Sequence, residues 1–269
     1  MYSILIRVPD SAYDSTVSAF SELGTAGLIE EQPTIRAFFE RRDKIDRAAR
    51  IFSPSVLEIR EEEPILYHIP DISDPLLVGA KFFIAPDLCD APTPPGRVRI
   101  SLEAQSAFGS GRHESTQLML KAIEKYLQPG MTTLDVGCGS GILSVAARLL
   151  GATRTFACDI DPHALAVASR ISNIELFAGS ADAVRDGVAD LVLANISARV
   201  VDALAGHLHR VTKPRGTVLI SGFIADHEPR RFKPEEIVAD GEWQCWICRR
   251  DPLLAAERNS PGKHDARWW

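Results

Sequence analysis

The chain has 269 residues, which is long enough for one α/β domain with a small second domain or for one large domain. Its 45% hydrophobic and 25% charged residues are typical of a soluble globular protein. The net charge of −6 argues against a broad nucleic-acid-binding surface, because such a surface needs clustered Lys and Arg to neutralise phosphates.

The hydropathy of the chain predicts a cytoplasmic protein. No stretch approaches the roughly 18 consecutive apolar residues of a membrane-spanning helix. Residues 1–7 lack the basic start and long apolar run of a signal peptide. We therefore expect no membrane contact.

The first 63 residues predict a small α+β domain. Strand and helix patterns follow one another in the order β-α-β-β-α-β, at residues 3–8, 11–23, 27–31, 34–40, 46–52 and 56–60. This is the order of a ferredoxin-like module. An acidic run at 61–63 and Pro64 end the pattern, so the domain is expected to span residues 1–63.

Residues 64–96 are expected to be a linker that ends in an entry arm. This range holds seven of the 17 prolines of the chain and no long periodic segment, although 81–86 has the pattern of a short strand. At the other end of the chain, residues 251–269 are polar and aperiodic, which predicts a loose tail.

Residues 97–250 predict a larger α/β domain. Strands are expected at 97–102, 132–136, 153–159, 174–177, 189–195 and 216–221, and helices at 116–127, 142–150, 163–172 and 199–211. Such alternation favours a parallel sheet with helices on both faces. Ser115 is the expected N-cap of the first of these helices.

A glycine-rich turn follows the strand at 132–136. Gly137, Gly139 and Gly141 are spaced one residue more tightly than the G-x-G-x-x-G of dinucleotide enzymes, whose helix N-terminus receives a pyrophosphate. In Asp-Ile-Asp-Pro at the end of the next strand, Asp159 can accept hydrogen bonds from both ribose hydroxyls, and Asp161 follows it. The combination predicts a site for S-adenosylmethionine. The alternative is an ordinary tight turn beside a solvated Asp159.

The end of the larger domain supports this cofactor. Segments 236–240 and 242–249, joined by a tight Asp240-Gly241 turn, predict a β-hairpin that places an antiparallel strand in the sheet. Rossmann-like methyltransferases of class I have this feature, and NAD domains lack it. The predicted fold class is therefore α/β, a Rossmann-like methyltransferase sheet with a C-terminal antiparallel hairpin, preceded by the small ferredoxin-like domain.

The cysteines and histidines of the sequence predict no disulfide, redox or metal site. The five cysteines are scattered and odd in number, which is typical of reduced thiols. Cys245 and Cys248 form a C-x-x-C, but the sequence around them predicts a buried strand. His207 and His209 have no third ligand nearby and are expected on a helix surface, so we expect no metal.

Two further segments point to a family. Residues 107–116 read Ala-Phe-Gly-Ser-Gly-Arg-His-Glu-Ser-Thr, and residues 193–197 read Leu-Ala-Asn-Ile-Ser at the end of the strand expected at 189–195. Together with the glycine turn and Asp-Ile-Asp-Pro, they resemble, in the same order, the motifs of the bacterial ribosomal protein L11 methyltransferase family. The resemblance covers about residues 100–222 by motif.

The resemblance implies roles for individual residues. Thr116, Gly137, Asp159 and Asn195 would contact S-adenosylmethionine or border its methyl group, and Phe108 would form part of a lid over it. It also implies a protein substrate, a large-subunit ribosomal protein, that residues 1–63 would recognise, with no direct need for nucleic acid.

Two residues are candidates for the chemistry itself. Methyl transfer from a sulfonium is an in-line displacement, so the enzyme mainly aligns the groups and excludes water. The side-chain carbonyl of Asn195 can accept an N–H of a neutral amine and orient its lone pair, although Asn195 can also be a simple strand-end cap. His113 is either a proton acceptor or a residue that holds the lid by a hydrogen bond.

The sequence as a whole predicts an S-adenosylmethionine-dependent methyltransferase that acts on protein amino groups, on lysine side chains or an N-terminal amine. A first alternative is the same chemistry on another protein lysine or on a small-molecule amine. A second alternative is a protein that binds S-adenosylmethionine without catalysis.

Overall fold

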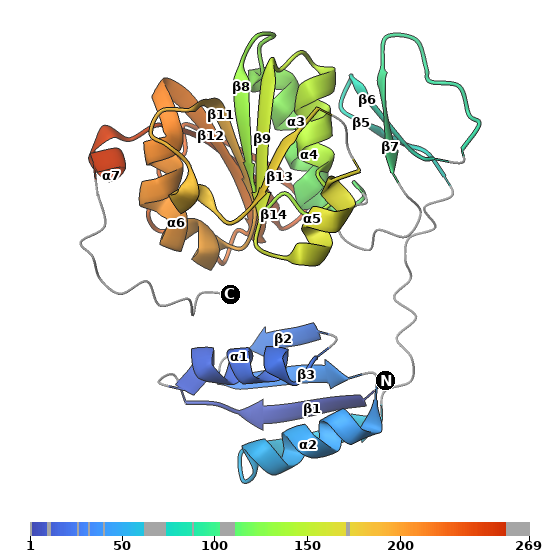
Figure 1. Ribbon diagram of the computed structural model, residues 1–269, viewed down its shortest axis with the longest axis vertical. Coiled ribbons are helices and arrows are strands. Elements are labelled where there is room, and N and C mark those ends of the chain that lie inside the picture. Colours follow the sequence, from blue (N-terminus) through green and yellow to red (C-terminus); the bar gives the residue numbers. More distant parts are fainter. Residues whose placement is uncertain are drawn as a thin grey trace. The chain divides into compact units, whose positions relative to one another are not determined.

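The computed structural model describes residues 2–9, 12–25, 27–31, 33–39, 41–61, 74–87, 89–102, 111–170 and 173–256. The chain divides into two compact units, one built on residues 1–69 and the other on residues 70–260. The ribbon in Figure 1 shows the elements of each unit.

The first unit is a four-stranded antiparallel sheet with two helices. Its elements are β1 (Tyr2–Arg7), α1 (Tyr13–Glu22), β2 (Gly27–Glu31), β3 (Thr34–Phe39), α2 (Arg42–Phe52) and β4 (Val56–Glu61). The strands lie in the order β2-β3-β1-β4, and the chain order is that of a ferredoxin-like module. The unit has its own core, in which Ile4, Phe20 and Ile45 are completely buried.

Helix α2 begins four residues earlier than the sequence predicted, at Arg42 instead of residue 46. Its buried residues Ile45 and Ala48 lie three apart on one face. The apolar stripe by which the helix packs on the core therefore starts before residue 46. Asp43 in the first turn favours this start, because its charge complements the helix N-terminus.

The expected linker at 64–96 is wrong for its second half. The strands β5 (Leu76–Val78) and β6 (Phe82–Pro86) form a three-stranded sheet with β7 (Val98–Leu102). The short strand expected at 81–86 is confirmed as β6, whereas β5 was not predicted. Val78 and Phe82 are fully buried in the core of the second unit. Residues 76–86 therefore belong to the larger unit, whereas residues 62–73 lie outside the described part of the chain.

The second unit is built on a seven-stranded sheet. Its strands are β8 (Thr132–Val136), β9 (Arg154–Asp159), β10 (Glu175–Ala178), β11 (Ala189–Asn195), β12 (Thr212–Ile224), β13 (Glu236–Asp240) and β14 (Trp243–Arg249). They lie in the order β10-β9-β8-β11-β12-β14-β13. The first five in this order are parallel, and β14 is antiparallel to both of its neighbours, which confirms the predicted hairpin.

Helices cover both faces of this sheet (Figure 1). They are α3 (Glu114–Tyr126), α4 (Ile142–Leu149), α5 (Pro162–Ala168) and α6 (Ala198–Val211). Alternate residues of β11 point to opposite faces: Leu191 and Leu193 pack in one core with α3 and α4, and Val192 and Ala194 in another with α6. The predicted two-sided α/β sheet is therefore confirmed.

The end of the described chain differs from the expected loose tail. Residues Pro252–Ala256 form a short helix, α7, which packs against α6. His209 Nδ1 of α6 accepts a hydrogen bond from the backbone N–H of Asp251 at 3.0 Å, so a polar contact that no sequence pattern reveals helps to fix this segment. Residues 257–269 lie outside the described part. No helix in the described ranges is long and apolar enough to cross a membrane.

Candidate functional site

The sheet brings three of the predicted segments together at one edge. Gly137 directly follows β8, Asp159 ends β9 and Asn195 ends β11. These strands are neighbours in the order β9-β8-β11 and run parallel, so their carboxyl ends meet at the same edge. Open α/β sheets bind ligands at this edge, which is called the carboxyl edge below.

The glycine turn is fixed by backbone hydrogen bonds to the next strand. The N–H groups of Gly137 and Cys138 both donate to the carbonyl of Cys158, at 2.9 and 3.0 Å. All three glycines have positive φ, and Gly141 (φ 79°) is the residue that precedes α4. A side chain at any of them would strain the backbone.

Gly137 and Gly139 serve different purposes. A Cβ on Gly137 would lie 2.6 Å from Cγ2 of Ile196, so this glycine is required by protein packing. A Cβ on Gly139 would meet no atom within 4 Å, so the space above it is open. A glycine next to open space at the carboxyl edge leaves room for a ligand to approach the backbone.

Asp159 holds the turn and the next helix at the same time. Its Oδ2 accepts the N–H of Gly139 and its Oδ1 accepts the N–H of Asp161, both at 2.9 Å. Each carboxylate oxygen has a second lone pair, so two acceptor positions remain for a ligand. Asp161 caps α5 instead: its Oδ1 accepts the N–H of His163 at 2.8 Å.

Asn195 carries a buried acceptor that the protein does not use. Its amide Nδ2 donates to Oγ1 of the buried Thr116 at 3.3 Å, which fixes the orientation of the side chain. Its Oδ1 is buried and has no hydrogen-bond partner among the described residues. Buried polar atoms are normally hydrogen-bonded, and each exception needs an explanation. Here an acceptor is left for a donor that the chain itself does not supply.

His113 has a structural role in this geometry. It is the N-cap of α3, and its Nδ1 accepts the N–H of Ser115 at 3.2 Å and lies 2.8 Å from Oγ of Ser115. Its ring lies roughly perpendicular to that of Trp243, with ring centroids 4.4 Å apart. The prediction that Ser115 caps this helix was wrong: the cap is His113, two residues earlier, whose imidazole nitrogen accepts the N–H of Ser115. Phe108 lies outside the described residues.

Sequence reasoning missed Asp135, the fourth of the five residues of β8. Its carboxyl is completely buried; Oδ2 accepts a hydrogen bond from Ser144 Oγ at 2.6 Å, and Oδ1 has no partner in the described part of the chain. Burial raises the pKa of this carboxyl to about 6. A carboxyl group between Leu134 and Val136, just before the glycine turn, was the available signal.

Three further residues at the carboxyl edge were also missed. Ser180 lies just after β10, is buried, and has a hydroxyl without a partner in the described ranges. Ile160 follows Asp159 and is 40% exposed, an apolar surface beside the carboxylate. At Gly222 a Cβ would lie 2.6 Å from the carbonyl oxygen of Ile196, so only glycine lets β12 approach the turn after Asn195 this closely.

The remaining cysteine and histidine predictions have mixed outcomes. Cys245 and Cys248 are free, buried thiols whose pKa is raised to about 12 by burial, and they point into the two different cores on opposite faces of the sheet. They cannot act as a redox pair. His209 is buried and stacks on Phe232, so the prediction of a surface histidine was wrong there. No group of three or more potential metal ligands occurs among the described residues.

The chain is similar to known proteins over most of its length. A sequence model of the family described as ribosomal protein L11 methyltransferase (PrmA) matches residues 6–251. Ribosomal protein L11 methyltransferases of Clostridium botulinum (strain Eklund 17B / Type B) and Burkholderia mallei (strain NCTC 10229) are 37% and 38% identical over 164 and 155 residues. These matches cover 56% of this chain and 52% and 51% of the relatives, so the chain spans about half the length of the curated relatives it matches.

A solved structure gives a similar result. The ribosomal protein L11 methylase from Lactobacillus delbrueckii subsp. bulgaricus matches with a TM-score of 0.59 and 28% sequence identity. The match covers 66% of this chain and 98% of that one.

Proposed function

Because the chain belongs to the ribosomal protein L11 methyltransferase family, we propose that it transfers methyl groups from S-adenosylmethionine to amino groups of a large-subunit ribosomal protein. The observation that carries the proposal is the carboxyl edge itself. Open space at Gly139, a carboxylate with spare lone pairs at Asp159 and an unused buried acceptor at Asn195 lie on neighbouring strands.

The residues at this edge fit the proposed cofactor. Asp159 would accept the ribose hydroxyls, and the exposed Ile160 beside it offers apolar surface to the flat base. The open space over Gly139 leaves room for the ligand, and the buried carboxyl of Asp135 favours a positively charged group nearby. When bound, S-adenosylmethionine supplies a methyl group on a positively charged sulfur.

Asn195 is the residue proposed to align the amine. Thr116 holds the Nδ2 end of the amide, so Oδ1 faces away from that contact and remains available as an acceptor. A neutral amine that donates one N–H to this oxygen has its lone pair fixed in direction, which is the alignment that an in-line displacement needs. The amine must arrive deprotonated, because its lone pair forms the new bond to carbon.

His113 is proposed to act as a positioning residue for the start of α3. Its Nδ1 is already engaged with Ser115, and α3 carries Thr116, which in turn holds Asn195. The histidine thus fixes the helix turn from which Thr116 reaches Asn195, and no proton transfer is assigned to it.

The first unit is proposed to recognise the protein substrate. Its helices cover one face of the four-stranded sheet, and the other face carries apolar as well as charged side chains: Arg36 lies opposite Leu5 and pairs with Glu58 at 2.9 Å. Arg7 is exposed at the end of β1. A sheet face with fixed charges that its own helices leave open suits contact with a folded protein, and a ribosomal substrate would place the enzyme in the cytoplasm.

The proposal is tested by incubating the chain with tritiated S-adenosylmethionine and a panel of purified large-subunit ribosomal proteins, with the product read by mass. We expect methyl incorporation into one protein of the panel, in steps of one methyl mass. Incorporation only into a small-molecule amine would select the first alternative substrate class. Binding of the cofactor without turnover on any amine would contradict an enzymatic function.

A further inference from the structure

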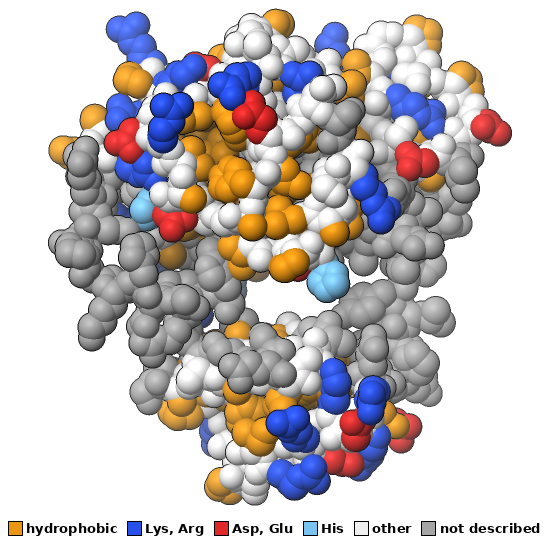
Figure 2. Space-filling model, viewed as in Figure 1, with side chains coloured by type: hydrophobic (Ala, Val, Ile, Leu, Met, Phe, Trp, Pro, Cys, Tyr) orange, Lys and Arg blue, Asp and Glu red, His pale blue; other side chains and the backbone are white. Residues whose placement is uncertain are grey.

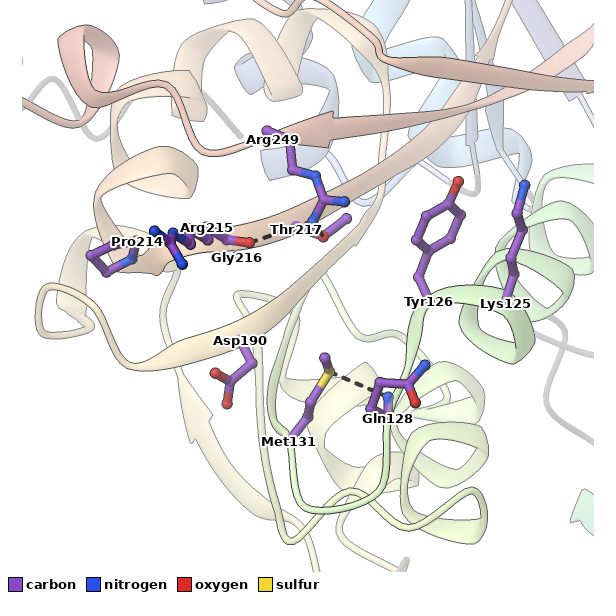
Figure 3. Close-up of a pocket in the computed structure, with 10 residues that line it drawn as sticks. All are labelled: Lys125, Tyr126, Gln128, Met131, Asp190, Pro214, Arg215, Gly216, Thr217 and Arg249. Carbon is purple, nitrogen blue, oxygen red and sulfur yellow. Dashed lines mark hydrogen bonds between the residues drawn. The ribbon is translucent and has the colours of Figure 1, made fainter.

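A hollow of about 410 Å³ lies at the opposite end of the parallel sheet from the glycine turn. It is bordered by the end of α3, the loop from α3 to β8, the turn at the start of β12 and the end of β14 (Figure 3). Strand β8 lies between Met131 in this hollow and Gly137, and the six residue steps between them span about 20 Å. The hollow is therefore distinct from the carboxyl edge. It is called the amino-edge pocket below.

The basic side chains of the amino-edge pocket are held in place by their neighbours. Arg249 donates from Nε to Glu235 at 3.0 Å and from Nη1 to Oγ1 of Thr217 at 2.8 Å. Lys125 Nζ lies 2.7 Å from both carboxylate oxygens of Glu236. The Nη2 group of Arg249 has no partner in the described part of the chain, so the pocket keeps a positioned donor. Figure 3 shows Lys125, Thr217 and Arg249 around the hollow.

Arg215 differs from the other basic residues. Its backbone has φ 67°, in the left-handed region that disfavours a side chain with a Cβ. Its guanidinium forms no hydrogen bond or ion pair with any described residue, and the residue is exposed. Glycine at this position would remove the backbone strain, and Arg215 makes no side-chain hydrogen bond or ion pair with a described residue that would offset it. Backbone strain of this kind is found at ligand sites.

The local charges leave an excess at Arg215. Asp190 pairs with Lys213 at 2.7 Å, Glu235 with Arg249 and Glu236 with Lys125. Four cations against three carboxylates give a local charge of +1 in a chain whose net charge is −6. In Figure 2, Lys and Arg side chains gather along the upper edge of the second unit. An anion is therefore the expected ligand.

The donors, the volume and the apolar lining of the pocket indicate which class of anion it fits. A phosphate has several oxygens and can accept hydrogen bonds from more than one arginine, whereas a guanidinium fork is already matched by a single carboxylate. Arg249 also donates from Nη1 to the backbone carbonyl of Arg215 at 3.4 Å, so the two arginines border the same hollow. The volume exceeds that of a bare phosphate and is within the range of small-molecule sites. Tyr126, Met131 and Pro214 provide apolar surface for the rest of the molecule.

We propose that the amino-edge pocket binds the phosphate ester of a nucleoside, as a free nucleotide or as a unit of an RNA chain, with Arg215 and Arg249 on the phosphate. This inference is independent of methyl transfer, because no residue of the pocket belongs to the carboxyl edge. Arg249 is held by Glu235 and Thr217 before the ligand arrives, and Arg215 gains its first partner on binding.

The test is calorimetric titration of the chain with uridine 5′-monophosphate, with uridine as the uncharged control, in the presence of S-adenosylhomocysteine. Arg215→Gly removes the guanidinium and suits the positive φ, so this variant should fold. Arg185→Gly is the matched control, because Arg185 is also exposed but does not line the pocket. The probe has a pyrimidine base because an adenine nucleotide could bind at the site proposed for the adenosyl cofactor.

We expect saturable binding of the nucleotide, none of uridine, and affinity at least tenfold weaker in Arg215→Gly but unchanged in Arg185→Gly. A fluorescent single-stranded RNA titrated by anisotropy distinguishes the source: tight RNA binding that depends on Arg215, without binding of the free nucleotide, assigns the pocket to an RNA chain. The proposal would be overturned if Arg215→Gly bound both the nucleotide and the RNA as tightly as the original chain. It would also be overturned if the original chain bound neither probe. Both readouts are independent of methylation, so a failed methylation assay does not affect them.

Discussion

The two ends of the same sheet differ in how their polar groups are paired. At the carboxyl edge, Asp135 Oδ1, Ser180 Oγ and Asn195 Oδ1 are buried without a partner among the described residues. At the amino edge, charges are paired with one another, as in Arg154–Glu175 and Lys213–Asp190. Unmade hydrogen bonds in a buried site cost stability. The comparison teaches that the carboxyl edge leaves buried polar atoms for a ligand, whereas the amino edge pairs most of its charges within the chain and leaves the exposed Arg215 as the exception.

The largest expected effect is loss of cofactor binding in Gly139→Val. A branched side chain would fill the open space and resist the φ of 53°, so we expect no detectable binding of S-adenosylmethionine by calorimetry. Gly187→Val is the matched control, since Gly187 also has a positive φ (61°) and open space but lies near the amino edge. Retained binding in a folded Gly139→Val protein would remove the cofactor from this turn.

The next largest effect is expected for Asp159→Ala. Loss of two hydrogen bonds to a charged acceptor should weaken S-adenosylmethionine binding by about 2 to 4 kcal/mol. Asp202→Ala serves as control, because this carboxylate also accepts backbone N–H groups, from Arg230 and Arg231, yet lies outside the site. If both variants bind the cofactor equally well, the ribose lies elsewhere.

A smaller effect concerns the stability of the ligand-free protein. Burial raises the pKa of Asp135 to about 6, above its ordinary value of 3.8, so the folded state binds more protons between these values. The stabilisation from the protonated form is complete below about pH 4 and is lost as the pH rises through about 6, on the order of 2 to 3 kcal/mol.

Asp135→Asn should remove this pH dependence. Urea unfolding at pH 4.5 and 7.5 measures the free energy of unfolding of both proteins, and the difference between them isolates Asp135 from other carboxyl groups. We expect Asp135→Asn to gain stability relative to the original chain as the pH rises. An equal pH dependence of the two proteins would mean that the Asp135 carboxyl is not held in a dry site.

The sheet was predictable because its signals are local. Apolar strands alternate with amphipathic helices between residues 132 and 221, and the turn at Asp240-Gly241 marks the hairpin. The expected linker was wrong mainly at β5, a run of only three apolar residues that follows Pro75, whereas the pattern of β6 was recognisable as a short strand. A strand of three residues is too short for periodicity to detect.

Only those residues of the candidate site that belong to a sequence motif were predictable. The glycine turn, Asp159 and Asn195 follow from strand ends, which the sequence marks. The role of Asp161 as a helix cap and the capping nitrogen of His113 depend on the directions of single hydrogen bonds. Gly222 is needed because two strands approach each other there, a contact between residues far apart in sequence.

The most direct test of the central claim is the effect of Asn195→Ala on kcat compared with its effect on cofactor affinity. If Asn195 Oδ1 aligns the amine, kcat at saturating cofactor should fall by roughly a hundredfold or more while the dissociation constant of S-adenosylmethionine changes little. Asn173→Gly is the control, since Asn173 has a positive φ (65°), which glycine adopts freely, in the turn that precedes β10. Unchanged kcat with weakened cofactor binding would make Asn195 a ligand of the cofactor alone and contradict the proposed alignment.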